Sequence, residues 1–173
     1  MKRVILLFAV LGLLSCNNKA QKIDDRAVLL QTISATEMSA LKDAQTIDPK
    51  LADSLMNLYD RYTQQYPKDS LCAEFMSKAT DIAANTHNCT RALEFLARIT
   101  DGYASSNYVE WAYFFKGSVY ADVCKDKEKA AEAYQFFLDN YPQSKFATAA
   151  TTLLTMLQLD NEMDLIREFE AKQ

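Results

Sequence analysis

Residues 113–142 read YFFKGSVYADVCKDKEKAAEAYQFFLDNYP, and this stretch decides the fold. Its key positions run in the order aromatic, small, apolar, and then Ala, large apolar, apolar, Tyr, which is the order that two antiparallel helices need. Gly117 lets the first helix approach its partner, and Ala130 does the same from the second helix. The large side chains fill the gaps between stacked pairs. The stretch therefore predicts one helix pair.

The same order of residues occurs 38 positions earlier. Seven sites keep size class and spacing under this shift: Phe75 and Tyr113, Ala79 and Gly117, Ile82 and Tyr120, Ala92 and Ala130, Leu96 and Tyr134, Ile99 and Phe137, and Tyr103 and Tyr141. The endings at residues 66–70, 103–106 and 141–144 are also alike and lie 37 and 38 residues apart. With three Gly and three Pro in 173 residues, the sequence predicts an all-α protein of about 2.5 to 3 stacked helix pairs.

A further helix is expected before the repeats. From Arg26 to Ile47 apolar residues recur at steps of three and four, which predicts one apolar stripe on a helix. Asp48 followed by Pro49 is typical of a new helix start, with Asp as N-cap and Pro at the first helical position.

Two more elements are expected after the repeats. The first is half of another pair, on the spacing of Phe146, Ala150, Leu154 and Leu157. The second is a separate last helix, capped by Asp160 or Asn161, with Met163, Ile166 and Phe169 on one side. A polar-backed helix of this kind covers the end of a helical stack.

At this point the sequence resembles a tetratricopeptide repeat (TPR). The matching aromatic, Gly, Tyr, Ala, aromatic and Pro positions are Tyr113, Gly117, Tyr120, Ala130, Tyr134 and Pro142. The resemblance covers about Leu51 to Leu157 and implies a short right-handed solenoid of antiparallel helix pairs with a capping C-terminal helix. The period of 38 and the Tyr-Pro endings are more similar to variants in small TPR lipoproteins of Gram-negative bacteria, including outer-membrane assembly lipoproteins of the BamD type.

The resemblance also implies where a partner would bind. In a TPR pair, residues of the first helix that lie off the packing stripe line an inner groove. Carried over to this sequence, they are Trp111, Phe114, Ser118 and Asp122, with Met76 and Thr80 from the preceding repeat. Large apolar groups that face a concavity are typical anchors for a protein partner. The alternative is that another segment, such as the helix from Arg26 to Ile47, folds into the groove and buries them.

The N-terminus has the layout of a bacterial export signal. Lys2 and Arg3 precede an apolar run of 11 residues from Val4 to Leu14, whereas a membrane-spanning helix needs about 20. Residues 13–16, Leu-Leu-Ser-Cys, resemble a lipobox, which implies removal of residues 1–15 and acylation of Cys16. The alternative is an ordinary signal with an incidental Cys.

Residues 16–25 would then comprise the lipidated Cys and a flexible tether, followed by the helical domain at 26–173. Asn17 is not the Asp that resembles an inner-membrane retention signal. We therefore expect the cell envelope as location, at the outer membrane facing the periplasm.

Charge and motif content exclude several function classes. Without Lys2 and Arg3 the net charge is 17 − 23 = −6, so the basic surface that nucleic-acid binding needs is missing. His87 is the only histidine, and Cys89 follows it two residues later in a predicted turn, where the two side chains would seldom face one substrate. A zinc site there would need two more ligands, and the isolated glycines form no phosphate loop. We expect no catalysis, metal or cofactor.

The remaining thiols are Cys72, Cys89 and Cys124. Cys89 and Cys124 both lie near predicted turns of successive repeats, and a disulfide between them would persist in an oxidising compartment. The other interpretation, which we favour from the sequence, is three small buried apolar residues.

Together these features predict a membrane-anchored TPR lipoprotein that acts as a non-catalytic adaptor and binds a protein or peptide in its groove. The alternative is a structural subunit of an outer-membrane assembly complex, similar to the BamD type, which would use its convex face and its terminal helix.

Overall fold

The computed structural model describes residues 17–40 and 47–171. The predicted signal at 1–15 and Cys16 lie outside the described residues. The described part is all-α and contains no strand, which confirms the predicted fold class. Its elements are α1 (Asn17–Ala40), α2 (Pro49–Gln65), α3 (Cys72–Asn85), α4 (Cys89–Gly102), α5 (Val109–Ser118), the π-helix η1 (Val119–Cys124), α6 (Lys127–Asn140) and α7 (Ala147–Glu170).

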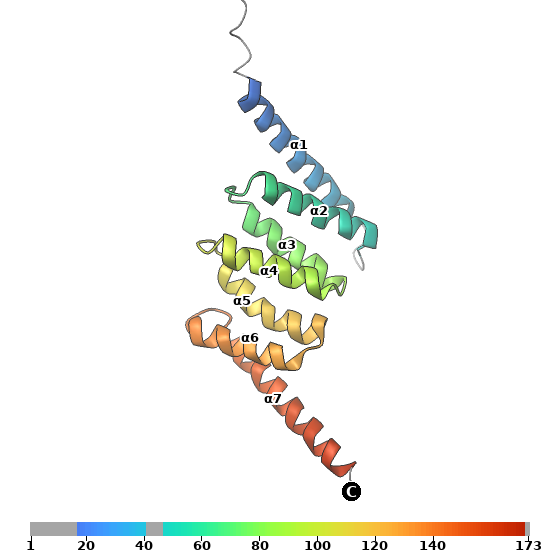
Figure 1. Cartoon of the computed structure of the whole chain (residues 1–173), viewed down its shortest axis with the longest axis vertical. Coiled ribbons are helices and arrows are strands. Elements are labelled where there is room, and N and C mark those ends of the chain that lie inside the picture. Colours follow the sequence, from blue (N-terminus) through green and yellow to red (C-terminus); the bar gives the residue numbers. More distant parts are fainter. Residues whose placement is uncertain (1–16, 41–46, 172–173) are drawn as a thin grey trace, which may run out of the picture.

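The helices are stacked in chain order. Each helix packs on the next one along the sequence, so the molecule is long, with α1 at one end and α7 at the other (Figure 1). A larger core cluster joins α1 to α5 and η1, and a smaller cluster of Tyr134, Phe137, Ala150 and Leu154 joins α6 to α7.

Three turns between helices share one hydrogen-bond pattern. The backbone N–H three residues after a Tyr donates to the carbonyl of that Tyr, over 2.9, 2.8 and 3.0 Å, in the pairs Asp69 to Tyr66, Ser106 to Tyr103 and Ser144 to Tyr141. The side chains of these same three residues also accept a hydrogen bond from the backbone N–H two residues further on, in Leu71, Tyr108 and Phe146. A short polar side chain three residues after the Tyr thus orients the next helix, so the similar endings in the sequence are the same turn.

The turn between α3 and α4 and the turn between η1 and α6 are alike as well. His87 and Lys125 adopt left-handed backbone conformations, with φ of 56° and 59°. Each precedes an N-cap, Asn88 or Asp126, whose side chain accepts from the backbone N–H three residues on. From Tyr66 to Asn88 the step is 22 residues, whereas from Tyr103 to Asp126 it is 23. The wider π-helical turns of η1 accommodate the extra residue.

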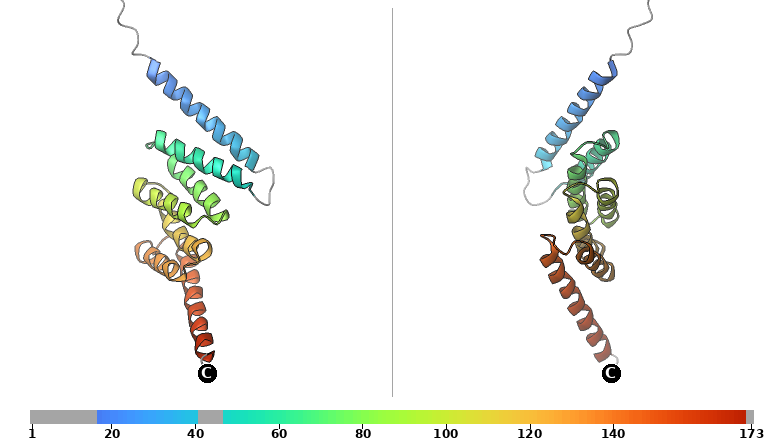
Figure 2. Two further views of the ribbon diagram at one scale, coloured as in Figure 1. Left: turned by 45° about the vertical axis from the view of Figure 1, so that its right-hand side comes forward. Right: turned by 90° about the vertical axis from the view of Figure 1, so that its left-hand side faces the viewer.

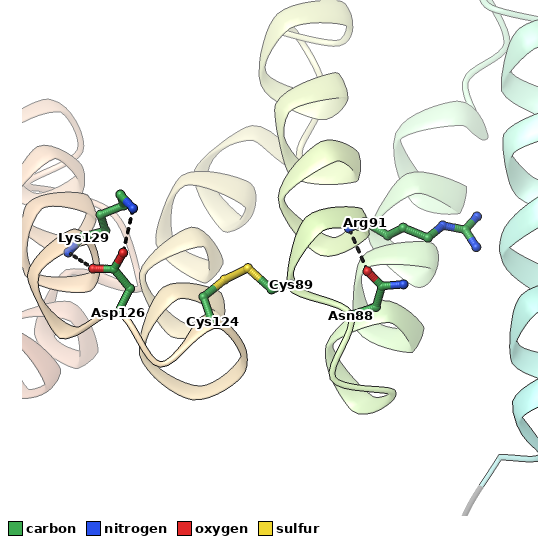
Figure 3. The surroundings of a disulfide bond; sticks show 6 residues. All are labelled: Asn88, Cys89, Arg91, Cys124, Asp126 and Lys129. Atoms are coloured by element: carbon green, nitrogen blue, oxygen red, sulfur yellow. Dashed lines mark hydrogen bonds and ion pairs between the residues drawn. A yellow bond between two sulfur atoms is a disulfide. The ribbon is translucent and has the colours of Figure 1, made fainter.

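A disulfide links these two turns. Cys89 is the first residue of α4 and Cys124 is the last of η1, and their Cα atoms lie 5.1 Å apart (Figure 3). The expectation of three unpaired thiols is therefore wrong for this pair, because the alignment of equivalent turns brings the two residues together. Cys72 is buried and free, and its Sγ donates to the carbonyl of Tyr66 over 3.1 Å.

The residues predicted to hold the pairs together lie in the core or at its edge. Fully or nearly fully buried are Phe75, Ala79, Ala92, Leu96, Gly117, Ala130 and Tyr134. Partly buried are Ile82, Tyr103, Tyr113, Tyr120 and Tyr141, whereas Pro142 is exposed. The small residues do allow close approach: a β-carbon on Gly117 would lie 2.6 Å from Cδ1 of Tyr134.

The two end helices differ from expectation. α1 begins at Asn17, so residues 17–25, where we expected a flexible tether, are helical. α7 continues without a break through Asp160 and Asn161, so the prediction of a separate capping helix is wrong. No Gly or Pro interrupts residues 143–173, and a side chain that can cap a helix does not end one on its own.

Candidate interaction surface

The two groove residues predicted on α3 are not at a surface. Met76 and Thr80 are both 0% exposed, and the Thr80 hydroxyl donates to the Met76 carbonyl over 2.8 Å. α3 packs against α2 and α4, and eight of its 14 residues are buried. The assignment of these residues to an open groove is wrong.

The two predicted anchors on α5 are half-buried by their own chain. The Trp111 ring stacks on Phe115, with centroids 4.9 Å apart, and Trp111 packs against the larger core cluster. Phe114 stacks on Phe146 at 5.0 Å and also contacts Tyr134 and the smaller cluster. These rings hold neighbouring helices together.

The other two predicted groove residues are polar. Ser118 Oγ lies 2.8 Å from the Tyr134 hydroxyl, so it ties the end of α5 to α6, whereas Asp122 is exposed on η1. Of the alternative, in which the helix from Arg26 to Ile47 covers the groove residues, the structure describes residues 26–40 and 47, and Leu29 and Ile33 of α1 belong to the same core cluster as Met76. α1 packs on α2, and its Glu37 pairs with Lys78 of α3 over 3.0 Å.

A different surface exposes large apolar side chains, on α7. One side of this helix packs against α6 through Ala150, Leu153, Leu154 and Leu157. Further along, Met156, Leu159, Met163 and Ile166 are 57%, 56%, 50% and 50% exposed. Figure 2 shows this part of α7 extending beyond the other helices.

These four residues form one stripe, which we call the outer face of α7. Successive residues are about 100° apart around an α-helix, so the steps of 3, 4 and 3 place all four on one side, roughly opposite Ala150 and Leu154. Phe169, 66% exposed, lies beside this stripe. Exposed apolar residues gathered on one face are typical of a contact with another molecule.

The sequence pattern predicted only part of this surface. Met163, Ile166 and Phe169 were predicted to lie on one side of a terminal helix, but Met156 and Leu159 were missed. The sequence does contain the pattern that predicts the whole surface, because residues 150–166 carry two apolar stripes at helical spacing on opposite sides. The predicted break at Asp160 concealed the continuity of the second stripe.

A cavity lies between α1, α2 and α3. It has a volume of about 390 Å³ and an apolar lining that includes Leu55 and Ile82. At its rim the Tyr59 hydroxyl donates to Glu37 over 2.7 Å, and burial raises the pKa of Tyr59. Lys78 pairs with both Glu37 and Glu74 over 3.0 Å. Tyr59, Glu37 and Lys78 are thus bonded to one another at the rim, whereas burial raises the pKa of Asp81, which also lines the cavity.

The candidate Cys-His pair is altered by the disulfide. His87 is exposed in its left-handed turn, but the sulfur of Cys89 is bonded to Cys124. A nucleophilic cysteine needs a free thiolate, so Cys89 cannot serve as one while the disulfide is intact. Among the residues that the structure describes, no three His, Cys, Asp or Glu side chains are grouped to hold a metal ion.

None of the helices within residues 17–40 and 47–171 combines the length and the hydropathy needed to cross a membrane. In comparisons with known proteins, no family model matches the sequence, and no curated protein matches it significantly.

Proposed function

We propose that this protein is a lipid-anchored, non-catalytic interaction module of the bacterial envelope that binds another protein through the outer face of α7. The observation that carries the proposal is the stripe of Met156, Leu159, Met163 and Ile166, each at least half exposed. Contacts of large apolar side chains supply most of the affinity in protein complexes. The proposal corresponds to the structural-subunit alternative, in which the terminal helix makes the contact.

The groove is the weaker candidate for the contact. Two of its six predicted residues are fully buried, and Trp111, Phe114 and Ser118 contact side chains of their own chain. Of the six, only Asp122 is exposed. A partner in the groove would have to compete with these internal contacts.

We assign the fold to a short right-handed solenoid of TPR-like helix pairs, similar to that of small envelope lipoproteins including the BamD type. The recurring Tyr turns and the equivalent left-handed turns at His87 and Lys125 support this assignment. Repeat proteins of this kind use their length to present extended binding surfaces.

Acylation of Cys16 would anchor the protein, and we place it at the outer membrane facing the periplasm. The support is the sequence of residues 1–17, with its basic start, apolar run and Leu-Leu-Ser-Cys-Asn ending. The disulfide agrees with this location, since disulfides persist in the periplasm.

A non-catalytic role is likewise part of the proposal. Its support is that the Cys-His pair, the strongest nucleophile candidate in the sequence, has its sulfur in a disulfide. We propose no nucleic-acid partner, because the net charge of −6 without the signal opposes binding to phosphate backbones.

Co-purification tests the proposed function. The full chain and a Met163→Asp/Ile166→Asp variant would be isolated from detergent-solubilised membranes of the producing bacterium, and bound proteins and the N-terminal peptide would be identified by mass spectrometry. We expect an acylated Cys16 in both and a bound protein that the double variant loses. Met38→Asp, at an equally exposed position on α1, is the matched control and should retain it. An unchanged set of bound proteins in the double variant would refute the role of α7.

A further inference from the structure

The contact between α5 and α6 indicates which kind of element could cover the outer face of α7. Tyr113 of α5 contacts the rings of Phe136 and Tyr141, with centroids 5.3 and 5.5 Å away. One helical turn later, Gly117 leaves room for the ring of Tyr134, and Ser118 bonds to the hydroxyl of the same ring. This side of α5 is therefore the one that the second helix of its pair covers.

The corresponding side of α7 is uncovered among the described residues. The turns before α5 and α7 are equivalent at a shift of 38 residues, from Ser106 to Ser144. The same shift carries Tyr113, Gly117 and Ser118 to Thr151, Thr155 and Met156, and all three are exposed. The outer face of α7 continues this side toward the C-terminus. α7 thus presents to solvent the side that α5 presents to α6.

The polar atoms on this side do not oppose burial. The hydroxyls of Thr151, Thr152 and Thr155 donate to the carbonyls four residues earlier in the same helix, over 2.9 to 3.0 Å. The three hydroxyls would keep these hydrogen bonds if another helix covered α7, so burial would leave none of them without an acceptor. Their methyl groups extend the apolar surface toward the start of α7.

The spacing of the stripe suits a helix as occupant. Met156, Leu159, Met163 and Ile166 follow steps of 3, 4 and 3, which is the a and d pattern that lets two helices pack lengthwise. An extended strand would meet only isolated side chains on a single helix. The partner should therefore offer its own stripe at the same spacing.

Charge identifies the partner more closely. Glu162 is exposed beside the stripe, Glu170 is exposed at the next position in line with it, and Asp160 is 66% exposed although it pairs with Lys127. Between residues 156 and 170 the sequence has five acidic residues and one basic residue, Arg167. A second copy of α7 would bring the same excess of negative charge and be repelled, whereas Lys and Arg beside the partner's stripe would be attracted.

We propose that a basic amphipathic helix of a second protein lies along the outer face of α7, in the position that α6 takes against α5. This inference rests on the proposed function and names the class of its partner. The apolar stripe supplies the affinity, and the acidic residues beside it select against acidic helices.

Binding of designed peptides tests this inference. The probe is a helical peptide of about three heptads with Leu at a and d and Lys at e and g, and the comparison peptide has Glu in place of each Lys. Binding to the full chain in neutral detergent would be measured by calorimetry. We expect the Lys peptide to bind at least about tenfold more tightly than the Glu peptide, from several charge pairs, and to lose at least about tenfold with Met163→Asp/Ile166→Asp.

A charge-reversed variant separates specific recognition from general attraction to an acidic protein. Glu162→Lys/Glu170→Lys should reduce or invert the preference for the Lys peptide, while Glu94→Lys/Glu132→Lys, two exposed positions on α4 and α6, should leave it unchanged. Equal binding of both peptides, an equal effect of the two charge variants, or self-association of the chain through the stripe would overturn the inference. Met163→Asp/Ile166→Asp could lose its bound proteins in the co-purification experiment although the full chain shows no preference between the Lys and Glu peptides. In that case the proposed function would stand, and only the basic character of the partner would be refuted.

Discussion

The ring of Tyr134 occupies the space beside the Cα of Gly117. Tyr134 is 1% exposed, and a β-carbon on Gly117 would approach Cδ1 and Cζ of the ring to 2.6 Å. The neighbouring Ser118 hydroxyl holds the Tyr134 hydroxyl at 2.8 Å, so the ring cannot move aside freely. The contact between α5 and α6 therefore depends on the absence of a side chain at residue 117.

Gly117→Ala should destabilise the protein although Ala is the better helix former. The gain in helix propensity is about 1 kcal/mol, whereas forcing a methyl group into a packed contact costs about 1 to 3 kcal/mol. The difference between the two effects gives an expected fall in the free energy of unfolding of up to about 2 kcal/mol, measured by chemical denaturation.

Gly102→Ala is the control for this substitution. Gly102 lies at the end of α4, and a β-carbon there would meet nothing within 4 Å. This variant should gain about 0.5 to 1 kcal/mol, because only the backbone effect remains. If both glycine variants gained stability, close approach of α5 and α6 would not be the reason for Gly117.

Reduction of the disulfide should weaken the stack. Cys89 and Cys124 are 35 residues apart in sequence, and a cross-link closing a loop of this size stabilises by about 4 kcal/mol through the unfolded chain. We expect dithiothreitol to lower the unfolding midpoint of the full chain, and Cys89→Ser/Cys124→Ser to show the lower midpoint without it. Cys72→Ala should keep the response to reductant, since Cys72 is free. A wild-type midpoint unaffected by reductant would contradict the structural role of the disulfide.

Local spacing predicted several helix boundaries because the turns are encoded locally. The Tyr endings and Asp48-Pro49 each place a capping residue at a defined offset from a helix, and the structure has helix boundaries at these positions. Gly117 could also be predicted, since a small residue facing a large one is a requirement of two helices that touch.

The remaining features depend on contacts between distant residues. The pairing of Cys89 with Cys124 requires the relative placement of two turns that are 35 residues apart, which spacing alone leaves open. Burial of Met76 and Thr80 depends on the neighbouring helices that pack on α3. Asp160 has the chemistry of a cap, but its position in the middle of α7 follows from uninterrupted helix formers on both sides.

Acid should weaken the attachment of α1 to the turn at Tyr66–Asp69. Arg26 of α1 bonds to the Asp69 carboxylate, with Nη2 2.6 Å from Oδ2. Burial alone would raise the pKa of Asp69, but the hydrogen bonds from the Leu71 N–H and the Arg26 guanidinium outweigh it and lower the pKa. Since the folded pKa lies below the unfolded value of about 3.9, this contribution is present above that value and is lost as pH falls through the folded pKa.

Comparison of the full chain with Asp69→Asn measures this contribution. The Arg26 side chain is 38% exposed, so we expect a difference of about 1 kcal/mol or less near neutral pH, detectable in urea unfolding, and convergence of the two curves in acid, as the pH falls through the folded pKa of Asp69. Glu94→Gln, at an exposed position on α4, should behave as the wild type at both pH values. A difference between wild type and Asp69→Asn that persists in acid would assign the effect to shape and not to charge.

The outer face of α7 should be dispensable for folding. Met163, Ile166 and Phe169 are at least half exposed, so the end of this helix adds little to the core, whereas Ala150 is fully buried in the contact with α6. Glu162→Pro should therefore remove helicity only near residues 162–170 in circular dichroism and shift the unfolding midpoint slightly. Ala150→Pro should lower the midpoint strongly, because a proline inside a packed helix costs about 3 kcal/mol or more. If Glu162→Pro destabilised the chain as much as Ala150→Pro, the apolar stripe would belong to the core of this protein and would not be a surface for another one.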